Sequence, residues 1–421
     1  MHFKKHALYL SGFFFGRGAL FLSPILLANS LVKIDYGQIE TSLATSSLLA
    51  SVLAMGSLGV LPLVVLRENS TATLRGIIGL NLIIVLMCLC LLTFGFIFGY
   101  SAEFRLIPLF TAVMVLQSLA STTLKVVGNS AYSLVLDAML LMLMVIGAYF
   151  AKLTGLSAYS LDFIFVLVGF YLSILMLFYL RAMSKYKKRN EEFAFAGLMR
   201  MGIPIMLGGF ISLLATTSGR FGMGLMAGPL DTADYSILTR VAVLPIVVHQ
   251  LILVGIFQQL FTEADFYFEK RVLTIVIFVV LSVLMCIFIY PSISFLFGNV
   301  FIESFNRNHL AGFWILIQSI LWSAIALNDL ALARSQLMQR VIPYSLIFMI
   351  FALILGWAGI NYLGISLYNF VFIHSVVMLG FYVTQSMLMM LLGLNLFKIW
   401  SFVTISFLAL FFCAPYFPHI T

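Results

Sequence analysis

Three arginines lie inside long apolar stretches of this sequence, where a permanent charge needs a physical reason. Arg17 follows GFFFG, Arg220 lies within GFISLLATTSGRFGMGLMAG, and Arg240 lies within LTRVAVLPIV. An arginine at the centre of a bilayer costs at least about 2.5–3.5 kcal/mol, so such residues usually face a water-filled cavity or a partner. The arginines therefore predict a cationic cavity for an anionic ligand. The alternative is that they reach outward or pair with helix-end carbonyls.

The composition of the chain indicates that the stretches around these arginines lie in a membrane. The chain has 421 residues, of which 63% are hydrophobic and 9% are charged, against roughly 25% charged residues in a soluble domain. A bilayer core about 30 Å thick needs roughly 20 apolar residues per helix, and such runs follow one another along the whole chain. The net charge of +8 lies in short loops between these runs, which argues against nucleic acid as a partner.

Charged, Gly-rich and Pro-rich breaks separate thirteen candidate spans. They cover 7–31, 39–66, 76–100, 106–127, 132–153, 160–182, 198–228, 233–262, 272–297, 309–333, 342–361, 366–393 and 398–416. If the N-terminus is cytoplasmic, sixteen of the 23 basic residues fall at cytoplasmic ends and four at outer ends. The positive-inside rule therefore predicts a cytoplasmic N-terminus, and the three embedded arginines belong to neither side.

The charged stretch RAMSKYKKRNEE (181–192) divides six spans from the rest. It predicts an N-terminal transmembrane bundle (1–182), a charged cytoplasmic linker (183–197), a C-terminal bundle (198–393) and an additional transmembrane helix (394–421). The expected fold class is an all-α polytopic membrane protein of 12 to 13 transmembrane helices. Two six-helix bundles, related as parallel repeats, would surround a central cavity.

The first hairpins of the two bundles look alike. A span with an embedded arginine ends at KIDYGQI (33–39) in one and at DTADYSI (231–237) in the other. Each reads as a turn in which an acidic residue, Asp35 or Asp231, caps the next helix. The alternative is that Asp-Tyr recurs by chance and only caps a helix. The predicted turn residues are Asp35, Tyr36, Asp234 and Tyr235.

Depth distinguishes the three arginines. At 1.5 Å per residue, Arg17 lies about 15 Å from the start of its span, near mid-membrane, whereas Arg220 and Arg240 lie roughly 10–12 Å from their shared hairpin. Two like charges at one level in a low dielectric are unfavourable unless an anion lies near them. Arg17, Arg220 and Arg240 are therefore the predicted substrate-binding residues.

Other embedded polar residues have structural and functional interpretations. Asp137 lies about two turns into its span and Lys125 near the end of the preceding one, so an ion pair across the hairpin is expected, with proton coupling through Asp137 as the alternative. His249, Gln250 and His374 lie inside spans. Together with Asp137 and Lys125, His249 and Gln250 are candidates for ion coupling or for polar contacts in the cavity. A membrane histidine more often makes one interhelical hydrogen bond than a proton relay.

Several functions are disfavoured by what the sequence lacks. No loop exceeds about fifteen residues, and we find no P-loop, HExxH or GxSxG motif. The four cysteines lie in apolar runs without His or acidic residues at metal-ligand spacing, which predicts no metal site. We therefore expect a secondary transporter that is not an enzyme and uses no cofactor.

The hairpin residues and the stretch after the linker also carry a resemblance. DYGQIETSLATSSLLASVLAMGSLGVLPLVVLR (35–67) and GIPIMLGGFISLLATTSGRFGMGLMAGPLDTADYSILTRV (202–241) resemble the O-antigen and capsule flippases of the multidrug/oligosaccharidyl-lipid/polysaccharide exporter superfamily. Tyr36-Gly37, Gly202 to Pro204, Arg220 and Tyr235-Ser236 match the positions of the family's motifs. Two features depart from the family: Gly219 stands where an acidic residue is frequent, and thirteen spans replace twelve or fourteen.

The resemblance implies a function and partners. The chain would flip a polyprenyl-pyrophosphate-linked oligosaccharide, an O-antigen or capsule repeat unit, from the inner to the outer leaflet of the bacterial inner membrane by alternating access. Its partners would be that lipid, the bilayer and other polysaccharide assembly proteins. A peptidoglycan-precursor flippase, an ion-coupled drug exporter and a membrane-embedded polysaccharide polymerase are the alternatives. Because Gly219 supplies no local counter-ion, the resemblance implies that the substrate pyrophosphate pairs with Arg220.

Overall fold

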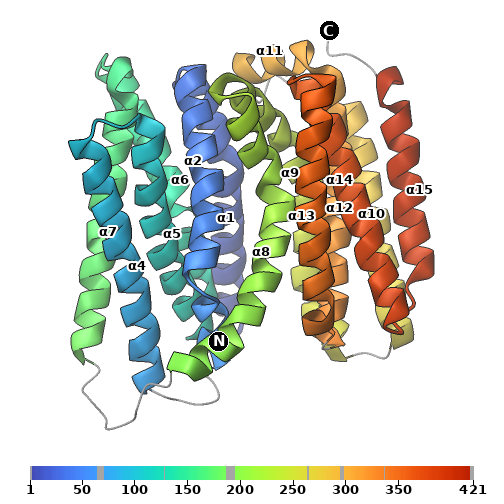
Figure 1. Ribbon diagram of the computed structural model, residues 1–421, viewed down its shortest axis with the longest axis horizontal. Coiled ribbons are helices and arrows are strands. Elements are labelled where there is room, and N and C mark those ends of the chain that lie inside the picture. The colour runs from blue at the N-terminus through green and yellow to red at the C-terminus, as the bar shows by residue number, and fades with distance from the viewer. Residues whose placement is uncertain are drawn as a thin grey trace. The chain divides into compact units, whose positions relative to one another are not determined.

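The computed structural model describes residues 2–63, 71–127, 129–185, 195–262, 265–293, 298–335 and 337–417, and the regular structure in these ranges is helical throughout (Figure 1). The α-helices are α1 (His2–Ser30), α2 (Lys33–Leu53), α3 (Ser57–Leu63), α4 (Thr71–Ile97), α5 (Ala102–Val126), α6 (Ser130–Leu153), α7 (Ser160–Lys185), α8 (Phe195–Met226), α9 (Pro229–Thr262), α10 (Asp265–Ile293), α11 (Asn299–Arg307), α12 (His309–Arg334), α13 (Met338–Leu363), α14 (Leu367–Leu391) and α15 (Phe397–Cys413). Short 3₁₀ segments lie at Ser157–Tyr159 and Ala414–Tyr416.

The predicted all-α membrane class is confirmed. In the described part of the chain, nine helices are long and apolar enough to cross a membrane. Helices α1, α2, α8 and α9 are also at least 21 residues long. These four carry the embedded charged residues Arg17, Glu40, Arg220, Asp234 and Arg240.

Each of the thirteen predicted spans coincides with a helix, and the second coincides with two. The break between α2 and α3 falls at Met55 and Gly56, whose φ angles of 48° and 71° are left-handed. Gly202 of α8 packs against this break, because a Cβ atom on Gly202 would lie 2.5 Å from the carbonyl oxygen of Met55. The Gly-x-Pro motif that begins at Gly202 thus contains a residue whose small size permits backbone contact.

The chain forms two compact units, residues 1–210 and 211–421, and the boundary between them in the sequence falls within α8. The predicted division at a charged linker (183–197) stays a prediction, because residues 186–194 lie outside the described ranges. In the first unit α5 is the central helix and contacts α2, α4, α6 and α7. In the second unit α12 is the central helix and contacts α9, α10, α14 and α15. In its most apolar stretch, 83% of the residues are buried.

The glycines before Arg17 let α1 approach α6 closely. A Cβ atom on Gly12 would lie 3.0 Å from the Cβ of Ala131, and one on Gly16 would lie 2.6 Å from the carbonyl oxygen of Leu134. Small residues four apart permit such close backbone approach between membrane helices. The neighbouring Gly18 has open space where its Cβ would be.

We therefore expect Gly16→Ala to destabilise the protein by about 1–3 kcal/mol, because the added methyl group meets backbone that cannot rotate away. Gly18→Ala is the matched control on the same helix and should be neutral or slightly stabilising, since alanine favours helix. Thermal unfolding of the detergent-purified variants measures both. Equal melting temperatures for the two variants would show that the α1–α6 approach tolerates a methyl group.

The two hairpins differ from the predicted turns. Helix α2 begins at Lys33 and α9 at Pro229, so Asp35 and Asp231 lie in first turns and do not cap the helices. Tyr36, Asp234 and Tyr235 also lie within helices. The predicted turn positions were therefore wrong: Val32 is extended, and Gly228 has a φ of 88° immediately before α9. A proline can start a helix and an acid suits its first turn, so the helices begin earlier.

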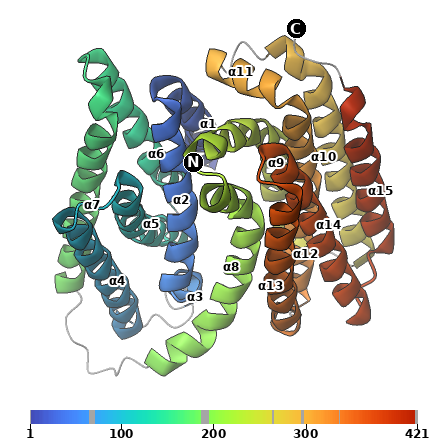
Figure 2. The same ribbon diagram turned by 45° about the horizontal axis from the view of Figure 1, so that its top comes forward.

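The residues of the two Asp-Tyr pairs make different contacts. The Tyr36 hydroxyl donates to Oε1 of buried Glu40 at 2.8 Å. Asp234 accepts a 2.6 Å hydrogen bond from the Ser304 hydroxyl, which ties the short helix α11 to α9. Figures 1 and 2 show α11 lying across the end of its unit where α9 begins.

Candidate functional site

A pocket of about 350 Å³ lies within the second unit, between α8, α9, α12 and α14. This volume is in the range of small-molecule sites. The polar and aromatic residues among those that line it are Thr217, Arg220, Tyr235, Thr239, Arg240, Gln250, Gln318, Ser319, Trp322 and His374. Because it lies among helices of a membrane protein, ligand charges in it are screened less than in water.

Two of the predicted binding residues, Arg220 and Arg240, meet at this pocket. Arg220 comes from α8 and Arg240 from α9, and both are half-buried. Among the described residues that line the pocket, none is acidic. The structure thus brings together the two arginines that the sequence placed at one level, and their role in ligand binding stays a prediction.

His374 connects three helices at this pocket. Its Nε2 lies 2.9 Å from the Ser218 hydroxyl of α8, and its Nδ1 lies 3.3 Å from Oε1 of Gln318 on α12. Gln318 Nε2 in turn donates to the Ser375 hydroxyl at 2.6 Å. An amide oxygen can only accept, so Nδ1 of His374 carries the proton in this contact. The expected interhelical hydrogen bonding of His374 is confirmed.

Tyr235 occupies space that Gly219 leaves open. A Cβ atom on Gly219 would overlap the Tyr235 hydroxyl, and one on Gly222 would lie 3.0 Å from the Phe370 ring. Tyr235 is 4% exposed, and its ring packs edge-on against Phe370 and His374, with centroids 5.9 and 6.5 Å away. Gly219 is therefore required to seat an aromatic residue of the pocket, a role that the sequence did not reveal.

His249 and Gln250 lie side by side in α9 but in different surroundings. His249 is 2% exposed and makes no hydrogen bond to a described residue; its ring meets Trp322 of α12 edge-on at 6.2 Å. The predicted interhelical hydrogen bond is thus replaced by an aromatic contact. Gln250 is half-buried and lines the pocket.

Arg17 belongs to the first unit. It lies near the middle of the 29-residue α1 and is half-buried. Its predicted depth in the membrane stays a prediction. Its part in a cavity shared with Arg220 and Arg240 stays a prediction.

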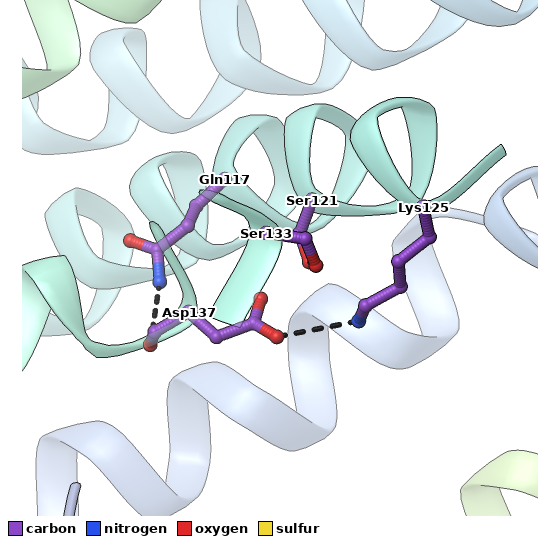
Figure 3. A network of polar contacts seen from close by, with 5 residues as sticks. All are labelled: Gln117, Ser121, Lys125, Ser133 and Asp137. Carbon is purple, nitrogen blue, oxygen red and sulfur yellow. Dashed lines mark hydrogen bonds and ion pairs between the residues drawn. The ribbon is translucent and has the colours of Figure 1, made fainter. Parts of the chain in front are cut away.

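The predicted ion pair between Lys125 and Asp137 is present in the first unit (Figure 3). Lys125 Nζ lies 3.2 Å from Asp137 Oδ2, with side chains 50% and 32% exposed. Gln117 donates to the main-chain oxygen of Asp137 at 3.0 Å, and the Ser121 and Ser133 hydroxyls lie 3.0 Å apart. Gln117, Ser121 and Lys125 recur every four residues, so one face of α5 meets α6 through polar contacts.

Because both members of this pair are partly exposed, we expect Asp137→Asn to change the unfolding free energy by less than about 1 kcal/mol. The charge-swapped variant, Lys125→Asp with Asp137→Lys, should regain transport that either single change loses, because a structural pair works in both orientations. Transport measured in cells for Lys125→Asp, for Asp137→Lys and for the swapped double variant checks this. A swapped variant as inactive as the two single variants would instead support proton coupling through Asp137.

Gln318, Trp322 and His374 line the pocket but were not predicted as binding residues from the sequence, where His374 was interpreted as structural. Gln318 and Trp322 are four residues apart on α12, so they share a helix face. That spacing was the available signal. It was weak because only the packing shows which face of a nearly buried helix meets a cavity.

In the described ranges, no group of three or more His, Cys, Asp or Glu side chains is placed to hold a metal ion. The four cysteines are free thiols, two of them exposed on the helix surface.

Comparisons with known proteins add a likeness in fold. No family model matches the chain, and no curated protein matches it. Among solved structures, it is similar to one described as "Lipid II flippase MurJ, inward closed conformation", with a TM-score of 0.57 and 14% sequence identity; the match covers 97% of this chain and 98% of that chain. The chain is thus a polytopic membrane protein whose fold is similar over nearly its whole length to that of this lipid II flippase.

Proposed function

We propose that this protein is a flippase that moves the headgroup of a polyprenyl-diphosphate-linked glycan across the bacterial inner membrane. The observation that carries the proposal is the pocket of the second unit, where Arg220 and Arg240 lie together among membrane helices. The similarity in fold to a lipid II flippase supports the proposal.

The chemistry of the pocket suits a diphosphate. A diphosphate is the part of such a lipid that crosses the bilayer least readily, because it carries charge that must leave water. Guanidinium groups keep their charge and match phosphate oxygens with paired N–H donors. In a low-dielectric site each such contact is stronger than in water. The guanidinium groups of the pocket can therefore replace the hydrogen bonds that the anionic headgroup makes to water.

Translocation would proceed by alternating access. The headgroup would enter a cavity open to the cytoplasm and leave from a cavity open to the outside, while the polyprenyl tail stays in lipid. The cytoplasmic N-terminus, inferred from the basic residues, is part of this proposal, as are contacts with other polysaccharide assembly proteins. Arg17 would contribute a further positive charge.

Two lipid substrates fit this proposal. The resemblance at the two hairpins favours an O-antigen or capsule repeat unit, whereas the fold similarity favours lipid II, the peptidoglycan precursor. Both carry a diphosphate between a polyprenyl tail and sugars, so the arginines serve either one.

Complementation in two bacterial strains distinguishes them. One strain lacks its own O-antigen repeat-unit flippase, and the other is depleted of its lipid II flippase. We expect the wild-type chain to restore surface polysaccharide in the first strain or growth in the second. Arg17→Ala, Arg220→Ala and Arg240→Ala should each reduce the rescue, at equal membrane levels of protein. Undiminished rescue by all three variants would contradict the cationic-cavity proposal.

A further inference from the structure

Trp322 differs from the two buried tryptophans of the second unit, Trp314 and Trp400, in the hydrogen bonding of its indole N–H. The indole N–H groups of Trp314 and Trp400 donate to the carbonyl of Phe411 and to Oδ1 of Asn328, both at 3.2 Å. A buried tryptophan usually finds such a partner. Trp322 lines the pocket, and its N–H makes no hydrogen bond to a described residue. Its indole is therefore available to a ligand.

Gln250 provides a second available group on the facing helix. The hydroxyls of Thr217, Thr239 and Ser319 donate to carbonyls of their own helices, and the amide of Gln318 is engaged by His374 and Ser375. Gln250 makes no hydrogen bond to a described residue. Its amide can both donate to and accept from a ligand.

The Trp322 ring is held from one side. His249, which is 2% exposed, meets it at an interplanar angle of 88° with centroids 6.2 Å apart. A ring supported in this way loses little freedom when a ligand packs on it. The pocket therefore combines two cations with a supported indole and an open amide.

We propose that Trp322 and Gln250 form a saccharide subsite beside the arginines, which binds the sugar attached to the diphosphate. The C–H face of a sugar packs on an aromatic ring, as apolar surface does, and its hydroxyls hydrogen-bond to an amide and an indole N–H. This inference rests on the proposed function, because the arginines are what bring the diphosphate to the pocket. According to this proposal, the second unit both binds the charged diphosphate and determines which sugar is preferred.

Binding of short-chain lipid analogues to the purified full-length protein tests this subsite. The probes are farnesyl diphosphate and the same lipid carrying N-acetylglucosamine, glucose or galactose. Farnesyl methyl diphosphate, which carries the same charge as the sugar-bearing diesters, is the reference probe. We expect at least one sugar-bearing probe to bind about tenfold more tightly than this reference, the combined effect of one stacking contact and one hydrogen bond. Trp322→Ala and Gln250→Ala should each lower this ratio, leaving farnesyl diphosphate affinity within about twofold.

Control variants separate a sugar contact from a structural role. Trp322→Phe should retain most of the sugar preference, because a phenyl ring also stacks. Trp357 lies on the surface of α13 with 64% of its area exposed, so Trp357→Ala should leave the ratio unchanged. If Trp322→Ala fails to fold, Gln250→Ala and Trp322→Phe still measure the subsite.

Each outcome has a distinct meaning. A wild-type protein without preference for any sugar-bearing probe, or variants that weaken all probes equally, would overturn the saccharide subsite and leave the diphosphate site intact. A wild-type protein that binds no probe, or Arg220→Ala without effect on farnesyl diphosphate, would instead count against the proposed function itself.

Discussion

Arg220→Ala and Arg240→Ala are each expected to weaken the binding of farnesyl diphosphate about ten- to hundredfold. Each change removes a charged donor from a half-buried pocket, and a hydrogen bond to a charged group contributes about 1.5–3 kcal/mol. Titration calorimetry on the detergent-purified chain measures the effect. Each lysine variant should retain part of the affinity, since lysine keeps the charge but loses the paired donors.

Arg307 provides the matched control. It pairs with Glu303 on α11 and is 57% exposed, so Arg307→Ala removes one positive charge away from the pocket. Its affinity should stay within about twofold of wild type, because exposed charges act weakly at a distance in salt. Equal losses for Arg307→Ala and Arg220→Ala would mean that net charge, and not the pocket, attracts the anion.

Gly219→Ala is expected to disturb the same pocket without removing a charge. The new methyl group would overlap the Tyr235 hydroxyl, and the Tyr235 ring packs edge-on against Phe370 and His374. Overpacking of this kind costs about 1–3 kcal/mol. We expect a lower melting temperature and about tenfold weaker diphosphate binding.

A double-mutant cycle isolates this contact. Tyr235→Phe removes the hydroxyl, so adding Gly219→Ala to Tyr235→Phe should cost less than adding it to the wild type. Gly209→Ala is the control on the same helix, because open space lies where its Cβ would be. Additive effects in the cycle would show that Gly219 is needed for a reason other than the Tyr235 hydroxyl.

The helices were predictable because the hydropathy of membrane spans depends on local composition. All thirteen spans coincide with helices for this reason. The break at Met55 and Gly56 was not predicted, because it depends on the contact with Gly202. The starts of α2 and α9 were placed too late because Asp35 and Asp231 resemble caps, although both lie in first turns.

The pocket was predictable in part. An arginine is conspicuous in an apolar sequence, and Arg220 and Arg240, which helix geometry related to each other, both line the pocket. His374, Gln318 and Trp322 were not predicted as binding residues, because α12 and α14 lie far from α8 in the sequence and their facing sides depend on tertiary packing. Gly219 shows the same limit: its space is filled by Tyr235, sixteen residues later.

The most direct test of the central claim is headgroup translocation in proteoliposomes made with the purified full-length chain. Fluorescent lipid II and a fluorescent polyprenyl-diphosphate-linked O-antigen unit would be placed in both leaflets, and the fraction reaching the opposite leaflet would be followed by a membrane-impermeant quencher. We predict translocation of at least one lipid by the wild type and by Arg307→Ala, and a rate at least about tenfold lower for Arg220→Ala and Arg240→Ala. Equal rates in all four proteins, or no translocation of either lipid by the wild type, would contradict the account.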